Sequence, residues 1–407
     1  MAPIPTNKGI SRFFRTPGIP LLRDPKVRSI FFQSTAVLFL LWVIFTIANN
    51  TNKNLEERGI KTGFHFFDDI APFAIPEKFF PFWSFELGES LYWEVLVIGI
   101  QNTVFISILG IISAAVLGFV VGVLRLSPNW LVSRFVGLYI EWFRNTPLLL
   151  QLLFWNFVVF LPLAPVVRNS WTWGEMFFLN KAGLYYPSPQ FSIASAVLLI
   201  AALVSAIVAI VFMCRWAQRR KDTTGKMFPV FFVSLAIIAA FLSTGVFLAG
   251  EHLSFNYPQL KGLNYRGGGR VPLTAFVLWF GLTVYTAAFI AENVRGGILA
   301  VSHGQSEAAS SLGLYRRITL QLIIIPQAMR VIVPPTISQF LNLTKNSSLA
   351  VAVGYPDLVN VWSGIALNQT GQALVIMMVT IGVYWLLSFL TSALLNAYNR
   401  RVQLEER

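Results

Sequence analysis

Cysteine is almost absent from this sequence: Cys214 is the only one among 407 residues. A single cysteine excludes an intrachain disulfide and a metal cluster built on cysteines. Histidine is also scarce, since His65, His252 and His303 are the only three and lie in separate loops, outside any HExxH motif. No Gly-rich P-loop precedes a Lys-Ser or Lys-Thr pair. We therefore expect no catalytic or metal site, no bound cofactor and no nucleotide site in this chain.

Charge is the second scarce quantity. Charged residues make up 12% of the chain, against about a quarter in a typical soluble protein. Hydrophobic residues reach 55% and include 36 Phe and 12 Trp, and the mean hydropathy is +0.64. This composition excludes a soluble globular enzyme, a disordered chain and a collagen-like fibre. We expect an all-α integral membrane protein, because about 20 apolar residues in a helix cross a bilayer.

Long uncharged runs predict about eight transmembrane helices. The eight runs are 29–52, 95–124, 145–167, 191–214, 227–250, 271–291, 318–344 and 372–397. The third follows a stretch that contains Arg134, Glu141 and Arg144, and the seventh is interrupted by Arg330. These two are the least regular of the eight.

The distribution of Lys and Arg orients the spans, because cytoplasmic loops carry an excess of these residues. The stretch 1–28 has six basic residues and one acid, and 215–226 has five basic residues. The loop 49–93 instead has seven acids and four basic residues. We therefore expect cytoplasmic termini and a periplasmic 49–93 loop. The loop 251–270 departs from the rule, with three basic residues and one acid on the outer side.

The net charge of +13 does not indicate a nucleic-acid partner, because the basic residues are scattered over several loops. The outer loop is instead crowded with aromatic residues, from Phe66 and Phe67 to Trp83 and Phe85. Aromatic rings favour the membrane–water interface. A segment lying at that interface is therefore favoured over a docking platform for a soluble partner.

A short helix is predicted in the connection between the sixth and seventh spans. Residues 301–326 read VSHGQSEAASSLGLYRRITLQLIIIP. Ser302 with Gln305 three residues later fits a capping box. Gly313 stands where a left-handed residue often ends a helix. We therefore predict a helix over 303–312.

This helix carries small side chains at Ala308 and Ala309 and polar ones at Gln305 and Glu307. Small side chains let another surface approach the helix backbone closely. A helix lying on the membrane would need a large apolar face with Lys and Arg opposite. The helix is therefore better suited to a cleft in another protein.

The same residues have the spacing of the EAA loop of ABC-importer permeases. The matching positions are Glu307, Ala308, Ala309, Gly313, Ile323, Ile325 and Pro326, where Ile325 replaces the usual Leu. In that family the short helix docks into a groove of the ATPase subunit. The resemblance therefore implies ATPase coupling through Gln305, Glu307, Ala308, Ala309 and Gly313.

Four further segments resemble the polar amino-acid permeases of this family. They are QNT at 101–103, EWFRNTPL at 141–148, YTAAFIAE at 285–292 and KNSSL at 345–349. The resemblance implies a five-helix type I importer core, formed by the second, third, sixth, seventh and eighth spans. The first span and the inserted fourth and fifth are additions, and with them the chain resembles a membrane subunit of the general L-amino-acid ABC transporters.

These features predict a division of the chain into six parts. They are a cytoplasmic tail at 1–28, an extra span with its periplasmic loop at 29–93, the first core part at 94–165, an insertion with two spans at 166–270, the second core part at 271–401 and a cytoplasmic end at 402–407.

The resemblance also implies partners and a location. These are two ATPase subunits that bind ATP and Mg, a second permease that is identical or homologous, a periplasmic amino-acid-binding protein, and the lipid of a bacterial inner (plasma) membrane. The function implied is import of L-amino acids from the periplasm.

Polar residues in or next to the spans are candidates for the substrate path, because charges there are costly and often functional. The candidates are Asn102, Thr103, Arg144, Asn145, Glu292, Lys345, Asn346 and Ser347. A zwitterionic amino acid needs donors for its carboxylate, such as Lys345, and acceptors for its ammonium group. Local explanations stay open: Glu292 and Arg295 fit an i, i+3 ion pair, Arg144 fits a snorkelling anchor, and 345–348 fits a solvated turn.

A secondary, ion-coupled transporter of small polar solutes is the alternative function. Its usual sign is an inverted repeat with paired broken helices, and the sequence shows no such repeat. A membrane-embedded enzyme is disfavoured, since His and Asp clusters are absent from the sequence.

Overall fold

The computed structural model describes residues 25–57, 59, 63–75, 87–225, 228–250 and 253–402. Most of the predicted N-terminal tail, the aromatic residues at 79–85, His252 and the end at 403–407 lie outside the described residues. Two compact units are present: 1–65 with 370–375, and 66–369 with 376–407. The first unit contains α1 (Pro25–Glu57), a long helix with exposed apolar side chains such as Phe39 and Trp42.

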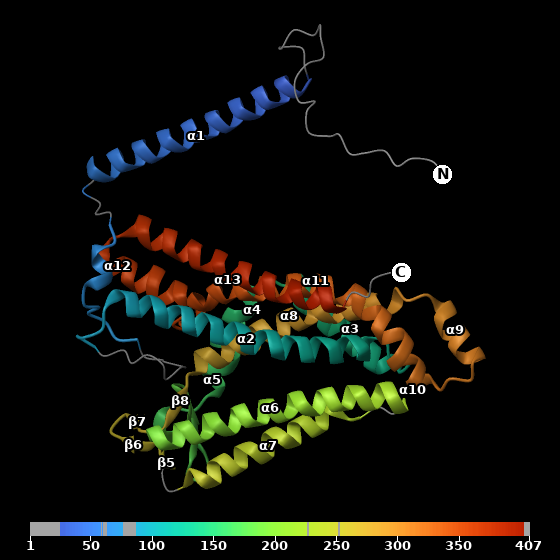
Figure 1. Ribbon diagram of the computed structural model, residues 1–407. Helices are drawn as coiled ribbons and strands as arrows, with labels where there is room; N and C mark the ends of the chain where they lie inside the picture. Colours follow the sequence, from blue (N-terminus) through green and yellow to red (C-terminus); the bar gives the residue numbers. More distant parts are fainter. Residues whose placement is uncertain are drawn as a thin grey trace. The chain divides into compact units, whose positions relative to one another are not determined.

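The second unit is built mainly of helices (Figure 1). They are, in chain order, η2 (His65–Asp68), α2 (Tyr92–Arg125), α3 (Trp130–Asn145), α4 (Leu148–Leu153), η3 (Phe154–Phe160), α5 (Leu161–Leu163), η4 (Val167–Asn169), α6 (Ile193–Thr224), α7 (Val230–Leu248), α8 (Leu273–Leu299), α9 (His303–Ser311), α10 (Arg316–Thr319), η6 (Leu320–Ile324), α11 (Ile325–Asn346), η7 (Ser347–Val353), η8 (Val359–Ala366), α12 (Leu367–Thr370) and α13 (Ala373–Val402).

The all-α membrane fold is confirmed, and each of the eight predicted runs coincides with a helix or a bent helical segment among the described residues. Six helices among the described residues are long and apolar enough to cross a membrane, and a bent pair can form a seventh. The fifth predicted run, 227–250, corresponds to α7 (Val230–Leu248), an apolar helix of 19 residues. A helix of that length rises about 28 Å, close to the hydrocarbon core of about 30 Å.

The third span is bent. Helix α3 meets the segment Leu148–Leu163 at 108°. Pro147 explains the break, because proline disfavours helical backbone in the residue before it, and Thr146 has the extended angles φ −107° and ψ 130°. The buried side chain of Gln151 compensates by donating to the carbonyls of Phe143 at 3.0 Å and Thr146 at 2.9 Å.

The core lies where α2, α8 and α11 pack together. Leu278, Leu282 and Ile290 of α8 are buried there. Close contact with α2 requires glycine: a Cβ at Gly118 would lie 2.6 Å from the Ile290 Cβ atom. Helix α8 is the most buried of the candidate spans: 67% of its most apolar 18-residue stretch is buried inside the protein.

Eight short strands, which the sequence did not predict, flank the α6–α7 hairpin in the chain. They are β1 (Trp171–Trp173), β2 (Phe177–Asn180), β3 (Gly183–Tyr186), β4 (Ser188–Phe191), β5 (Leu253–Asn256), β6 (Gln259–Lys261), β7 (Asn264–Arg266) and β8 (Gly269–Val271). They form a four-stranded antiparallel sheet in the order β1-β2-β3-β8 and two pairs, β4-β5 and β6-β7.

Candidate coupling helix and polar pocket

The predicted helix at 303–312 is confirmed as α9, and its C-terminal signal is also confirmed. Gly313 has a left-handed φ of +68°, and the amide of Leu314 donates to the Ala309 carbonyl at 3.1 Å. The predicted capping box is wrong, because the Ser302 side chain makes no capping hydrogen bond. The Gln305 side chain is engaged elsewhere, accepting a hydrogen bond from Gln327 Nε2 at 3.2 Å.

The small face of α9 is divided between the interior and the surface. Ala309 is only 1% exposed, since α9 packs against α10 and η6 of its own chain. Gln305, Glu307, Ala308 and Gly313 are exposed. Ala309 therefore supports the loop from within, and a partner can reach the other four residues.

Two large apolar side chains beside α9 are also open. Leu312 is 78% exposed and Tyr315 is 80% exposed. Together with Gln305, Glu307 and Ala308 they make up an exposed set of residues on and beside α9, which we call the α9 surface. The sequence indicated its polar and small residues but not these two.

A polar pocket of about 280 Å³ lies between α8 and α11. Its lining residues are Tyr285, Thr286, Phe289, Gln339, Asn342 and Asn346. Three carboxamides and two hydroxyl groups offer both donors and acceptors to a bound solute. Asn346 was predicted for the substrate path, and the other five residues were not.

Helical spacing explains how the pocket forms. Gln339, Asn342 and Asn346 follow the i, i+3, i+7 pattern that places residues on one face of a helix. Tyr285 and Phe289 stand four residues apart on α8. The amide pattern in α11 was therefore a readable signal that the sequence analysis did not use.

Two of the predicted charges lie near this pocket. The guanidinium carbon of Arg144, in the last turn of α3, is 5.4 Å from the centroid of the Phe289 ring. Glu292 is one turn beyond Phe289 and accepts from Arg295 Nε at 3.1 Å, which confirms the predicted ion pair.

The other predicted path residues have different surroundings. Asn145 and Lys345 are exposed and do not line the pocket. Ser347 is fully buried, and its hydroxyl donates to the Thr344 carbonyl at 2.7 Å.

Asn102 and Thr103 join α2 to the segment that precedes η8. Asn102 Nδ2 donates to the Pro356 carbonyl at 2.8 Å, and the Leu358 amide donates to Thr103 Oγ1 at 3.0 Å. The Tyr355 hydroxyl donates a hydrogen bond to the backbone carbonyl of Asn102 at 3.1 Å. These buried side chains therefore have partners within the chain, and neither lines the polar pocket.

Titratable groups do not gather into a metal site in the part of the chain that the structure describes: no group of three or more His, Cys, Asp or Glu side chains there can hold a metal ion. Two features near the predicted site residues can receive a partner or a ligand, the exposed α9 surface and the polar pocket.

Comparison with known proteins identifies the family of this chain. Residues 223–404 match the family described as binding-protein-dependent transport system inner membrane component. The amino-acid ABC transporter permease protein YhdX of Escherichia coli is 42% identical over 384 residues, which cover 94% of this chain and 96% of that protein. The chain belongs to this permease family.

The alignments of two further relatives extend over almost the whole of this permease. The general L-amino acid transport system permease protein AapQ of Rhizobium johnstonii is 41% identical, with 94% of each chain covered. The glutamate/glutamine/aspartate/asparagine transport system permease protein BztB of Rhodobacter capsulatus is 37% identical, with 95% of this chain and 96% of that protein covered.

Membership of the family decides between the functions that the sequence left open. The chain is a multi-pass membrane permease of the ABC-importer type and not an ion-coupled secondary transporter. In this family the chain is the membrane component of a transport system and is not a catalytic subunit.

Proposed function

We propose that this permease imports L-amino acids from the periplasm through the bacterial inner membrane, driven by two ATPase subunits that bind ATP and Mg and dock on the α9 surface. The observation that carries the proposal is likeness over nearly the whole chain to permeases named for amino-acid transport. A periplasmic amino-acid-binding protein delivers the substrate. Both termini lie in the cytoplasm, as the basic loops indicate.

The polar pocket between α8 and α11 supplies the chemistry of the path. Gln339, Asn342 and Asn346 offer carboxamide oxygens to an ammonium group and N–H groups to a carboxylate. Arg144 adds a positive charge near the pocket through its position over Phe289. Lys345, exposed and one residue before Asn346, adds a second positive charge at the end of α11.

A second permease, a copy of this chain or a homologous one, completes the path. In the proposed division, residues 94–165 and 271–401 form the core, and 29–93 and 166–270 are additions. The core contributes five helices, which enclose one half of a channel. The partially open pocket on α8 and α11 is then closed by the facing subunit.

Affinity purification of the tagged chain in mild detergent, followed by mass spectrometry, tests this assembly. We expect an ATPase and a permease to co-purify in stoichiometric amounts. Substrate-dependent co-purification of a periplasmic binding protein would add the third partner. Isolation of the folded chain without any ATPase would contradict the proposal.

A further inference from the structure

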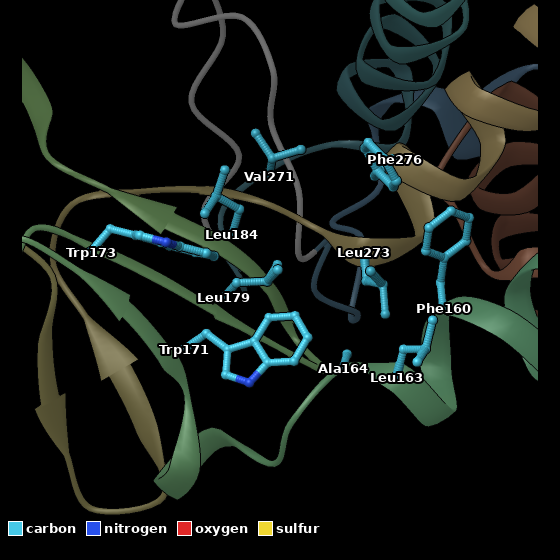
Figure 2. Close-up of a pocket in the computed structure, with 10 residues that line it drawn as sticks. All are labelled: Phe160, Leu163, Ala164, Trp171, Trp173, Leu179, Leu184, Val271, Leu273 and Phe276. Atoms are coloured by element: carbon cyan, nitrogen blue, oxygen red, sulfur yellow. The ribbon is translucent and has the colours of Figure 1, made fainter.

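The four-stranded sheet has one strongly apolar face. Its registers align Trp171 with Leu179, Leu179 with Leu184, and Leu184 with Val271, so one residue from each strand forms a row across the sheet. Trp173 lies two residues from Trp171 and so shares its face. Figure 2 shows these five side chains directed toward one cavity.

The opposite face of the sheet is already covered by protein. Phe178 and Tyr185 pack on Tyr265 of β7, with ring centroids 4.5 and 5.1 Å apart. The apolar row faces a cavity instead. This cavity, of about 470 Å³, lies between the row and the ends of α5 and α8. We call this cavity the sheet pocket.

The sheet pocket suits a hydrocarbon ligand. Its remaining walls are Phe160, Leu163, Ala164, Leu273 and Phe276 (Figure 2). The indole N–H groups of Trp171 and Trp173 are the polar groups among its lining side chains, so a polar solute would lose its hydrogen bonds to water on entry. The volume is within the range of small-molecule sites, about 300–1,000 Å³.

The position of the sheet pocket indicates the source of that ligand. Helix α5 ends the segment Leu148–Leu163 of the bent span, and α8 begins at Leu273, so the cavity lies at one end of each of these two apolar segments. It is the end of α8 remote from α9 (Figure 1). Tryptophan is enriched where hydrocarbon meets the head groups, and Trp171 and Trp173 are half-exposed.

Basic side chains border this region. Arg168 in η4 and Lys181 in the β2–β3 turn are exposed, and the Lys181 amide donates to the Pro165 carbonyl at 2.9 Å, next to Ala164 of the pocket wall. The sheet-forming segments 166–191 and 253–271 contain five basic residues and one acid. Basic residues beside a bilayer attract anionic head groups.

We propose that the sheet pocket holds an acyl chain of an anionic phospholipid, whose phosphate is bound by Arg168 and Lys181. The lipid fills the apolar volume that the sheet leaves open and fixes the sheet on the ends of α5 and α8.

Native mass spectrometry of the full chain, purified with its co-purifying subunits and exposed to phosphatidylglycerol or phosphatidylcholine, tests the proposal. The wild-type chain is expected to retain one phosphatidylglycerol in preference to phosphatidylcholine. Leu179→Trp fills the pocket and should reduce retention at least tenfold. Thr172→Trp adds the same ring to the opposite face of the sheet and should leave retention unchanged.

A second pair of variants changes the charges near the pocket and leaves its apolar packing intact. Arg168→Gln combined with Lys181→Gln should weaken phosphatidylglycerol retention about 30-fold, at roughly 1 kcal/mol for each basic residue. Lys261→Gln combined with Arg266→Gln removes two charges from the β6–β7 hairpin and is the matched control. Equal retention of both lipids by the wild type, or unchanged retention in Leu179→Trp and in the Arg168/Lys181 variant, would overturn the proposal.

Discussion

Individual polar residues in this permease have two different roles, although they look alike in the sequence. Gln339 and Asn342 line a pocket that is open to a solute. Thr103 is fully buried, and its hydroxyl accepts the Leu358 amide. Transport and stability measurements can separate the two groups.

Gln339→Ala and Asn342→Ala should each weaken amino-acid uptake without loss of assembly. Each removes a carboxamide from the pocket, and hydrogen bonds to charged groups contribute about 1.5–3 kcal/mol. We expect the apparent KM to rise about tenfold or more, measured with radiolabelled substrate in cells. Ser338→Ala, at an exposed position of the same helix, is the control. Normal uptake in both pocket variants would place the path elsewhere.

Thr103→Val should instead lower stability. The change keeps the shape of the side chain but leaves the buried Leu358 amide without its acceptor, which costs about 1–3 kcal/mol. Thermal unfolding of the purified protein should show a lower Tm for Thr103→Val than for Thr103→Ser, which retains the hydroxyl. The apparent KM of the surviving protein should not change. A raised KM at unchanged Tm would return Thr103 to the substrate path.

At the scale of the element, α9 is held by its own chain on one side and open on the other. Ala309 is buried and Ala308 is exposed, although they are adjacent and identical in type. A bulky residue at the two positions should therefore have different effects.

Ala308→Trp should abolish or strongly weaken ATPase binding while membrane insertion stays normal. Overpacking typically costs 1–3 kcal/mol, roughly 5- to 150-fold in an association constant. Ala309→Trp should act on the chain itself and reduce the yield of folded permease, because the side chain has no room beside α10 and η6. Co-purification of the ATPase with each variant, scaled to folded permease, distinguishes the two. Full ATPase binding by Ala308→Trp would show that coupling uses another surface.

The elements also show what sequence patterns can and cannot predict. Gly313 ended α9 as expected, because a left-handed residue there depends on local geometry alone. The capping box failed, since the Gln305 side chain bonds instead to Gln327, which is 22 residues away. The pairings of β3 with β8 and of β4 with β5 could not be predicted, because they join segments separated by the whole α6–α7 hairpin. The other pairings are local, and the sequence analysis did not use their signal.

The site was only partly predictable for the same reason. Asn346 was recognised as a polar residue at the end of a span, and it does line the pocket. Asn102 looked equivalent, but its partner is the carbonyl of Pro356, 254 residues further along the chain. A single sequence gives no information on such a contact.

At the scale of the whole molecule, the orientation that we propose in the membrane rests on the charges of the loops. Single cysteines at Asn54 and Thr223, in a Cys214→Ser background, test it with a membrane-impermeant thiol reagent. Both positions are exposed in the structure. We expect labelling of intact cells at Asn54→Cys, after the outer membrane is made permeable, and labelling at Thr223→Cys only after lysis. The reverse pattern would reject the proposed orientation.

ATP-driven uptake into proteoliposomes tests the central claim most directly. The tagged permease, purified with its partners, is reconstituted with ATP inside the vesicles, and the binding protein and a radiolabelled L-amino acid are added outside. We predict accumulation that requires ATP hydrolysis and persists when ionophores collapse every ion gradient. Uptake that is independent of ATP and is abolished by the ionophores would contradict the account.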